Sequence, residues 1–364
     1  MGGPAEAGPY VRGAGPAEHQ TPAKADPPFR EDQMRKFAFV GVLLLLSAGV
    51  YSAQQAVSPE QLKTPPPKEP AWAFPVQQGS LAPDPGPKKL AGSDKTYTPE
   101  EIDNLMAPPD WLPNDHPPAP SIVTKGHGGA LACGSCHLMS GIGHPESADV
   151  AGMPETYVKQ QMMDFKSGAR VDIARMNGIA KEMSDQEIAE VSAWFAAQKP
   201  RKNNRVVEAE MAPKTIVAQG RMRFVDPAGG MEPIGNRIIT VPEDVQQARL
   251  RDPNTKFVSY VPPGTLARGK VLVETGDNKK TVACGTCHGP GLVGLKEIGK
   301  TGIASPRIAG VHPIYLARQL YLFKDGSRNG MTSKLMMPAV ANLTDADILA
   351  ISAYLASMDP TGGK

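Results

Sequence analysis

The sequence predicts an all-α protein made of two tandem helical units, with a long connector that contains short β-like runs. Three observations support this prediction. The stretch 151–170 is repeated at 309–328, the stretch 183–196 is repeated at 343–356, and a near-identical hexapeptide precedes each copy. Because both hexapeptides head the same series of segments, the chain is interpreted as a tandem duplication.

The stretches 183–196 and 343–356 are predicted to be the closing helices of the two units. Ser184 with Glu187, and Thr344 with Asp347, have the spacing of a capping box. Each stretch also places its apolar residues on one helical face. These residues are Ile188, Val191, Trp194 and Phe195 in the first unit, and Ile348, Ile351, Tyr354 and Leu355 in the second.

A small-residue segment lies just before each hexapeptide. Gly126 stands in VTKGHGG and Gly269 in ARGKVLV. A glycine has no side chain to hold a helix away, so an aromatic residue of the closing helix can approach its backbone. We therefore expect Trp194 to pack on Gly126 and Tyr354 to pack on Gly269.

The two hexapeptides, ACGSCH at 132–137 and ACGTCH at 283–288, use all four cysteines of the chain. C-x-x-C-H is the attachment signature of c-type haem. Cysteines three residues apart on a helical turn face the same way and can form thioether bonds to the two vinyl groups of one porphyrin. The histidine that follows then becomes the proximal iron ligand. The sequence thus predicts two covalently attached haem c groups, held by Cys133, Cys136 and His137, and by Cys284, Cys287 and His288.

A zinc site and a redox dithiol are the alternative interpretations of the cysteines. The two C-x-x-C pairs stand too far apart in the chain for a zinc ribbon. A thioredoxin-like dithiol needs a βαβ context, which the sequence does not offer.

The distal ligands are predicted to be methionines, because a thioether stabilises ferrous iron and raises the potential of a carrier. Alignment of the closing helices without gaps places Met176 opposite Met336. Met337 competes with Met336, and His144 or His312 would instead give bis-histidine ligation. The alternative to methionine ligation is that most of the 16 methionines in the chain merely fill gaps around a flat cofactor.

Four further polar residues stand at repeated positions: Arg170 with Arg328, and Tyr157 with Tyr315. One interpretation is that they hydrogen-bond the haem propionates. The other is that the arginines are solvated on helix surfaces and the tyrosines pack in the cores.

The N-terminal region predicts a membrane anchor. Residues 1–36 are rich in Gly, Pro and Ala and are expected to be a disordered cytoplasmic tail. Residues 37–53 form an uncharged apolar run that follows basic residues, as in a signal-anchor whose N-terminus stays in the cytoplasm. A cleaved signal peptide is the alternative.

The remaining boundaries follow from composition. The predicted parts are a proline-rich periplasmic tether (54–120), a first haem domain (121–199), an inter-domain connector (200–263) and a second haem domain (264–364). The tether either extends as a spacer or wraps onto its own domain or onto a partner subunit. In the connector, TIVAQGRMRFV and NRIITVPED flank DPAGG, which is consistent with a small hairpin.

From about residue 105 to 358 the sequence resembles tandem dihaem class I cytochromes c, of the cytochrome c-four kind. The resemblance rests on CGSCH, CGTCH, the repeated AG…Y…Q…F…G…R stretches and the spacing from Met to closing helix. It implies two small α-helical domains that pass single electrons, with His137 and His288 as proximal ligands and Met176 and Met336 as distal ligands. The connector is longer than in the basic family, and the N-terminal anchor is an addition to it.

Taken together, these features predict a membrane-anchored electron carrier of the bacterial inner membrane, with both haem domains in the periplasm. Its expected donor is a quinol-oxidising complex or a dehydrogenase, and its expected acceptor is a haem-copper oxidase or another cytochrome of a respiratory chain. The formal charge of +2 does not suggest nucleic acid as a partner, and no small-molecule substrate or enzymatic activity is expected. The alternatives are a dihaem enzyme, such as a peroxidase or thiosulfate dehydrogenase, and a fixed subunit of a larger complex.

Overall fold

The computed structural model describes residues 68–363. The predicted cytoplasmic tail, the predicted anchor at 37–53 and the beginning of the predicted tether lie outside the described residues. Between residues 68 and 363, no helix combines the length and apolar character that a membrane span requires.

The first helical unit is built around two longer helices, α5 and α7. Its elements are α3 (Ser121–Thr124), α4 (Gly134–His137), α5 (Glu155–Ser167), α6 (Met176–Glu182) and α7 (Asp185–Ala196). Helix α7 begins with the predicted capping box, in which Ser184 and Glu187 each satisfy a backbone N–H of the other. Its predicted apolar face is buried against α3, α5 and α6.

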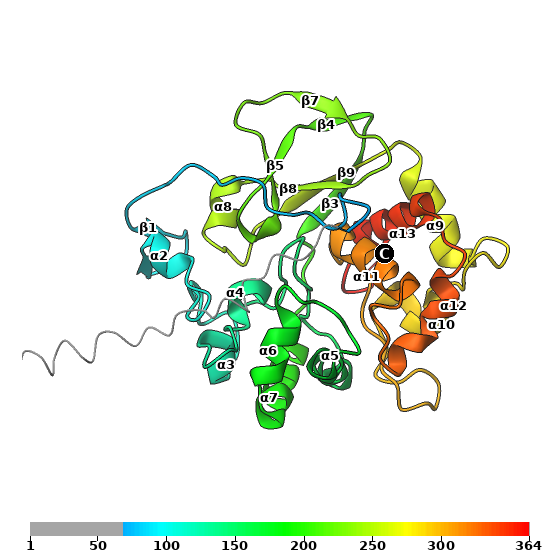
Figure 1. Ribbon diagram of the computed structural model, residues 1–364, viewed down its shortest axis with the longest axis horizontal. Coiled ribbons are helices and arrows are strands. Elements are labelled where there is room, and N and C mark those ends of the chain that lie inside the picture. Colours follow the sequence, from blue (N-terminus) through cyan, green and yellow to red (C-terminus); the bar gives the residue numbers. More distant parts are fainter. Residues whose placement is uncertain (1–67, 364) are drawn as a thin grey trace, which may run out of the picture. The chain divides into compact units, whose positions relative to one another are not determined.

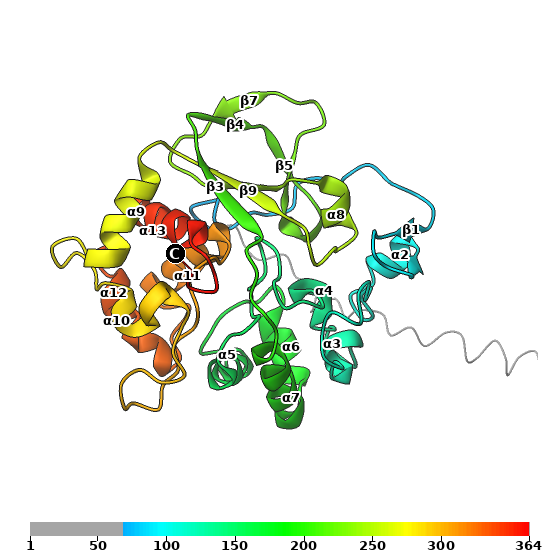
Figure 2. The same cartoon turned by 180° about the vertical axis from the view of Figure 1, so that it is seen from behind.

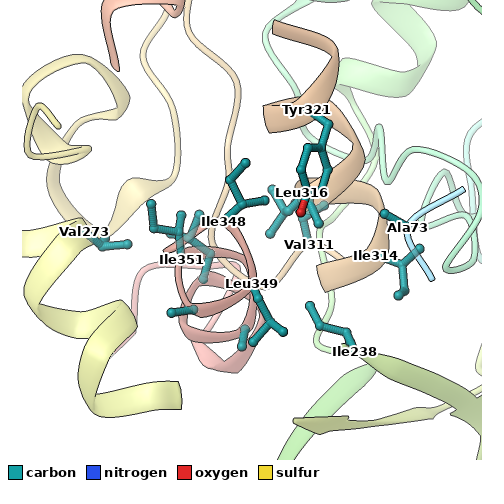
Figure 3. Close-up of a cluster of buried hydrophobic side chains, with 14 of the residues drawn as sticks. Ala73, Ile238, Val273, Val311, Ile314, Leu316, Tyr321, Ile348, Leu349 and Ile351 are labelled. Carbon is teal, nitrogen blue, oxygen red and sulfur yellow. The ribbon is translucent and has the colours of Figure 1, made fainter. Parts of the chain in front are cut away.

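The second helical unit has the same order of elements, gathered to one side of the strands in Figures 1 and 2. They are α9 (Thr265–Thr275), α10 (Gly285–His288), α11 (Pro313–Lys324), α12 (Met337–Val340) and α13 (Asp345–Ser357). The capping box of Thr344 and Asp347 is present, as predicted. Figure 3 shows side chains of α11 and α13 in one buried cluster together with Ala73 and Ile238.

The two units differ at their first helix. Helix α9 has 11 residues, whereas its counterpart α3 has 4. Alignment of the two hexapeptides places residues 114–124 opposite α9, and this stretch contains Pro117, Pro118 and Pro120. Proline removes a backbone donor and clashes with the preceding helical turn, so a longer helix cannot form there.

The two units also differ in the glycine contacts that were predicted for them. A methyl group at Gly269 would lie only 2.6 Å from Cβ of Tyr354, so that contact is confirmed. The predicted contact of Trp194 with Gly126 is wrong, because the nearest neighbours of Gly126 are Met106, Ala130 and Ala132. Trp194 instead donates its indole N–H to the Pro117 carbonyl at 3.2 Å.

The connector carries most of the β-structure. Strands β3 (Asn204–Glu208), β9 (Phe257–Val261) and β8 (Ile239–Pro242) form a sheet in the order β3-β9-β8. Strands β3 and β9 are parallel, while β8 and β9 are antiparallel. Strand β3 follows α7 and β9 precedes α9, so the connector leaves the first unit and enters the second along neighbouring strands.

The predicted hairpin between TIVAQGRMRFV and NRIITVPED is wrong in its pairing. The first run folds back on itself, because β5 (Thr215–Val217) pairs with β6 (Arg223–Val225). The second run supplies β8, which pairs with β9. DPAGG instead joins β6 to β7 (Met231–Pro233), which pairs with β4 (Met211–Pro213), so DPAGG lies opposite Lys214. A short helix, α8 (Val245–Arg249), completes the connector.

Residues 68–120, expected to be the end of a tether, pack against the rest of the described chain. Trp72 and Ala73 are buried in the core of the second unit. Farther along are β1 (Lys88–Lys89), β2 (Thr96–Tyr97) and α2 (Pro99–Ile102). Trp111 is buried and donates its indole N–H to the carbonyl of Leu250 at 2.7 Å. The alternative in which this segment wraps onto its own domain is therefore the one observed.

Candidate haem-binding site

A single cavity of about 570 Å³ joins the two helical units. Its lining is mostly apolar and contains side chains from both hexapeptides and from the facing loops of both units. All eight predicted site residues border it: Cys133, Cys136, His137, Met176, Cys284, Cys287, His288 and Met336.

The first hexapeptide forms one helical turn, α4, that ends on His137. The ring Nδ1 of His137 lies 2.8 Å from the carbonyl oxygen of Ala148. A carbonyl only accepts, so Nδ1 carries the proton and Nε2 keeps a free lone pair. Burial lowers the pKa of His137, which keeps the ring neutral. His137 thus has the tautomer that a haem ligand needs.

The second hexapeptide repeats this geometry in α10. The ring Nδ1 of His288 lies 2.8 Å from the carbonyl oxygen of Pro306, and burial lowers the pKa of His288. Two histidines, each fixed by a backbone carbonyl and each following a C-x-x-C turn, therefore face the same cavity. A metal-binding histidine is commonly oriented by such a bond at its other ring nitrogen.

The distal methionines predicted from the alignment occupy matching places. Met176 is the first residue of α6, is partly buried and contacts the core of the first unit. Met336 precedes α12 and contacts the core of the second unit in the same way. Their ligation of iron stays a prediction, which their position on the cavity supports.

The competing distal ligands lie elsewhere. Met337 does not border the cavity, although its neighbour Met336 does. The ring of His144 is engaged by the backbone N–H of Glu146 at 3.3 Å and by the Ser147 hydroxyl at 3.0 Å. His312 is buried away from the cavity, with its Nε2 3.2 Å from the side-chain amide of Asn203.

Arg170 reaches from the first unit into the second. Its guanidinium donates to Gln161 at 2.9 Å, to the Tyr315 hydroxyl at 3.0 Å and to Gln319 at 2.7 Å. All of these side chains border the cavity. Of the two earlier interpretations, solvation on a helix surface is therefore wrong for this arginine, which is buried.

Arg328 makes the mirror-image set of bonds. Its guanidinium donates to Gln319 at 3.0 Å, to the Tyr157 hydroxyl at 2.9 Å and to Gln161 at 2.7 Å. It too is buried, and burial together with the neighbouring Arg170 charge lowers its pKa. The two glutamines were visible in the sequence only as repeated residues, and their role as shared acceptors was not predicted.

The chemistry of this cavity fits a porphyrin. Within the described residues neither Arg170 nor Arg328 forms an ion pair, and Nε of Arg328 has no hydrogen-bond partner. Two buried positive charges whose hydrogen-bond partners are neutral are costly, and anions bound in the cavity would compensate them. Porphyrin propionates are such anions, and the apolar lining suits the flat ring.

The alternative chemistries of the cysteines do not fit. Burial raises the pKa of the Cys133 thiol to about 12 and that of Cys284 to about 11, whereas a redox dithiol needs an accessible thiolate. Among the residues that the structure describes, no three His, Cys, Asp or Glu side chains gather to hold a metal ion.

A helical crevice with a C-x-x-C-H turn on one side and a methionine on the other defines a class I c-type cytochrome, here present twice. The chain belongs to the cytochrome c family: the family model "Cytochrome c" matches residues 266–359. Cytochrome c-554(548) of Halomonas halodenitrificans is 34% identical over 80 residues, which cover 22% of this chain and 89% of that protein.

Two longer matches each cover 64% of the chain. Cytochrome c4 of Pseudomonas aeruginosa is 29% identical over 235 residues, covering 64% of this chain and 87% of that protein. A thiosulfate dehydrogenase electron acceptor of Thiomonas intermedia is 27% identical over 237 residues, covering 64% and 82%. The chain is a cytochrome c4-like dihaem class I cytochrome c with two covalently attached haem c groups.

Proposed function

We propose that this chain is an electron carrier that passes single electrons in a periplasmic respiratory chain. Haem iron between a histidine and a methionine supplies reversible one-electron chemistry. The observation that carries the proposal is the placement of His137 with Met176, and of His288 with Met336, on one shared cavity. Such a ligand set leaves no open iron position for a substrate.

The chain's own residues tune this chemistry. The carbonyls of Ala148 and Pro306 fix the two histidine rings and keep Nε2 available. The apolar lining excludes water, which favours the less charged ferrous state and raises the potential. Arg170 and Arg328 supply positive charge where the two units meet. This charge also favours the ferrous state and so raises the reduction potential.

A redox titration that records visible and near-infrared spectra tests this function. We expect two one-electron transitions and a sulfur-to-iron band in the near infrared for both haems. High-spin spectra, or rapid binding of cyanide to one haem, would instead indicate an open iron and favour the dihaem-enzyme alternative.

The proposed location is the bacterial inner membrane, with residues 37–53 as an uncleaved anchor and both haem units in the periplasm. The uncharged run and the basic residues before it support this location. Mass spectrometry of protein extracted from membranes should find the N-terminal tail still attached. A mature N-terminus near residue 50 would exclude the anchor.

The proposed donor is a quinol-oxidising complex or a dehydrogenase, and the proposed acceptor is a haem-copper oxidase or another cytochrome. A second candidate function is a fixed subunit that accepts electrons from a dehydrogenase, and the similarity to the Thiomonas intermedia thiosulfate dehydrogenase electron acceptor supports a dehydrogenase as the donor. Gentle detergent extraction at high salt distinguishes the two. A free carrier elutes alone, whereas a fixed subunit co-elutes with a large complex.

A further inference from the structure

The two hexapeptide turns have different surroundings, although their own geometry is the same. Alignment of ACGSCH with ACGTCH pairs Leu131 with Val282. Leu131 is 0% exposed, whereas Val282 is 46% exposed. In the turns themselves Gly134 and Ser135 are buried, while their counterparts in the second unit, at 285–286, are exposed.

The first turn is covered by residues 99–117, which we call the cap. The backbone N–H of Ala132 donates to the carbonyl of Leu105 at 3.1 Å, and that of Gly126 donates to Met106 at 2.7 Å. Pro108 lies 3.4 Å from the place that a side chain on Gly134 would occupy. The cap thus pairs with the segment that leads into the CGSCH turn and leaves no room beside it.

The connector closes the same turn from another direction. The guanidinium of Arg251 donates to the carbonyl of Ser135 inside the turn and, at 2.8 Å, to the carbonyl of Ile102 in the cap. Arg251 therefore fastens the cap to the turn. In the second unit the corresponding turn is exposed on this side.

The second turn is instead bordered by an exposed surface, the second rim, which consists of Lys279, Val282, Lys334 and Leu335. Val282 and Leu335 both line the cavity and are 46% and 52% exposed, so they form part of its edge. The two halves of the rim are joined by a bond from the Thr281 hydroxyl to the carbonyl of Ala339 at 2.6 Å.

The charge of the second rim is positive. Lys279 and Lys334 are exposed and form no ion pair with any described residue. Lys296 and Lys300 add two positive charges on the loop whose Ile298 and Ile303 line the cavity, against one negative charge at Glu297. In the first unit the positions aligned with Lys279 and Lys334 are a glycine and an alanine, Gly128 and Ala174.

Access to a hexapeptide turn matters for electron exchange. The thioether bonds fix the vinyl edge of each porphyrin at its two cysteines. Electron tunnelling slows steeply with the distance between redox groups, so a partner exchanges electrons fastest where it can touch that edge. At the first turn the cap and Arg251 stand in the way, and at the second turn nothing in the described chain does.

We propose that external partners exchange electrons with this protein at the second rim, where an acidic redox protein docks, while the cap keeps partners away from the CGSCH turn. Exposed apolar side chains among unpaired lysines fit a partner with an apolar centre and surrounding carboxylates. The inference rests on the proposed electron-transfer function and adds the place of exchange and the charge of the partner.

The test is stopped-flow reduction of the oxidised, full-length holoprotein by two donors of opposite charge. Reduced flavodoxin is the acidic protein donor, and hexaammineruthenium(II) is the cationic one. The variant is Lys279→Glu with Lys334→Glu. The matched control is Lys181→Glu with Lys214→Glu, which makes the same change in net charge at exposed positions on the first unit and the connector.

At low ionic strength the second-rim variant should react about tenfold more slowly with flavodoxin and faster with the ruthenium complex. The control should change by less than about twofold with either donor. Equal slowing in both variants, or no slowing in the second-rim variant, would overturn the proposal. A redox titration of each variant distinguishes failure of the docking proposal from failure of the proposed carrier function. Two intact one-electron transitions would support the carrier function even if the kinetics contradicted docking at the second rim.

Discussion

Arg170 and Arg328 face each other across the two helical units as an isolated antiparallel bridge. Each guanidinium also stacks on a phenylalanine of its own unit, at 4.4 Å for Phe165 and 4.3 Å for Phe323. Each donates to the glutamines of both units, so neither arginine belongs to one haem site alone. Two buried charges of the same sign are costly without compensating anions, and the propionates of a bound haem would supply such anions.

Replacement of either arginine by glutamine should therefore lower both reduction potentials. If the iron lay on the order of 10 Å away, loss of one positive charge would destabilise the ferrous state by about 1–2 kcal/mol at an effective dielectric constant of ~20, which corresponds to tens of millivolts. Spectroelectrochemical titration of Arg170→Gln and Arg328→Gln measures the shift. The control Lys181→Gln removes an exposed charge and should leave both potentials nearly unchanged. If only the haem of the mutated unit shifted, the shared role of the pair would be wrong.

Local patterns in the sequence were enough to predict the repeated helices and to select eight side chains that border one cavity. The capping boxes at Ser184 and Thr344 specify helix starts through bonds within four residues. The C-x-x-C-H turns place their histidines by helix geometry alone. The gap-free alignment also placed Met176 and Met336 on the cavity, because both units keep the same spacing there.

Contacts between distant segments were not predictable in the same way. The parallel pairing of β3 with β9 joins residues about fifty positions apart, and no turn signal specifies such a pair. The bond from Arg251 to the Ser135 carbonyl joins the connector to the first turn without any local pattern. The short length of α3 does have a local signal in the sequence, because three prolines stand opposite α9.

The distal ligands can be tested one unit at a time. Met176→Ala should remove about half of the near-infrared sulfur-to-iron band, because one of two thioether ligands is lost. Met336→Ala should remove the other half. Met337→Ala is the matched control, because Met337 is adjacent in sequence but does not border the cavity. A full band in Met336→Ala together with a reduced band in Met337→Ala would reverse the assignment.

A buried ion pair fastens the first unit to the second. Asp149 and Arg307 are 2.7 Å apart with side chains 1% and 2% exposed, and Arg307 also donates to the Ala151 carbonyl at 3.2 Å. Burial raises the pKa of Asp149 despite the neighbouring guanidinium. Arg307→Met would leave the buried carboxylate of Asp149 without its positive partner and should lower the free energy of unfolding by about 3–5 kcal/mol.

Denaturation in guanidinium chloride, followed by haem absorbance, measures that loss. The double variant Asp149→Leu with Arg307→Met removes both charges and should recover most of the lost stability, since apolar replacements of buried pairs are often close to neutral. A double variant as unstable as Arg307→Met alone would show that the hydrogen bonds of Arg307 to backbone carbonyls matter more than its charge.

The stability of the protein should depend on pH through His312. Burial lowers the pKa of His312 to about 3, from an ordinary value of 6.5. As the pH falls below 6.5, the histidine of the unfolded chain takes up a proton that the folded one does not. The contribution of His312 to stability is therefore intact above pH 6.5 and decreases by about 1.4 kcal/mol per pH unit as the pH falls toward 3.

Urea denaturation of wild type and His312→Gln across this pH range isolates the effect. The variant should be less stable at pH 7, because the bond to Asn203 and the ring contact with Phe257 are altered. Its stability should nevertheless decline less steeply below pH 6.5, since the proton-linked loss is gone. Equal slopes for wild type and His312→Gln would mean that the folded protein takes up the proton at His312 without penalty.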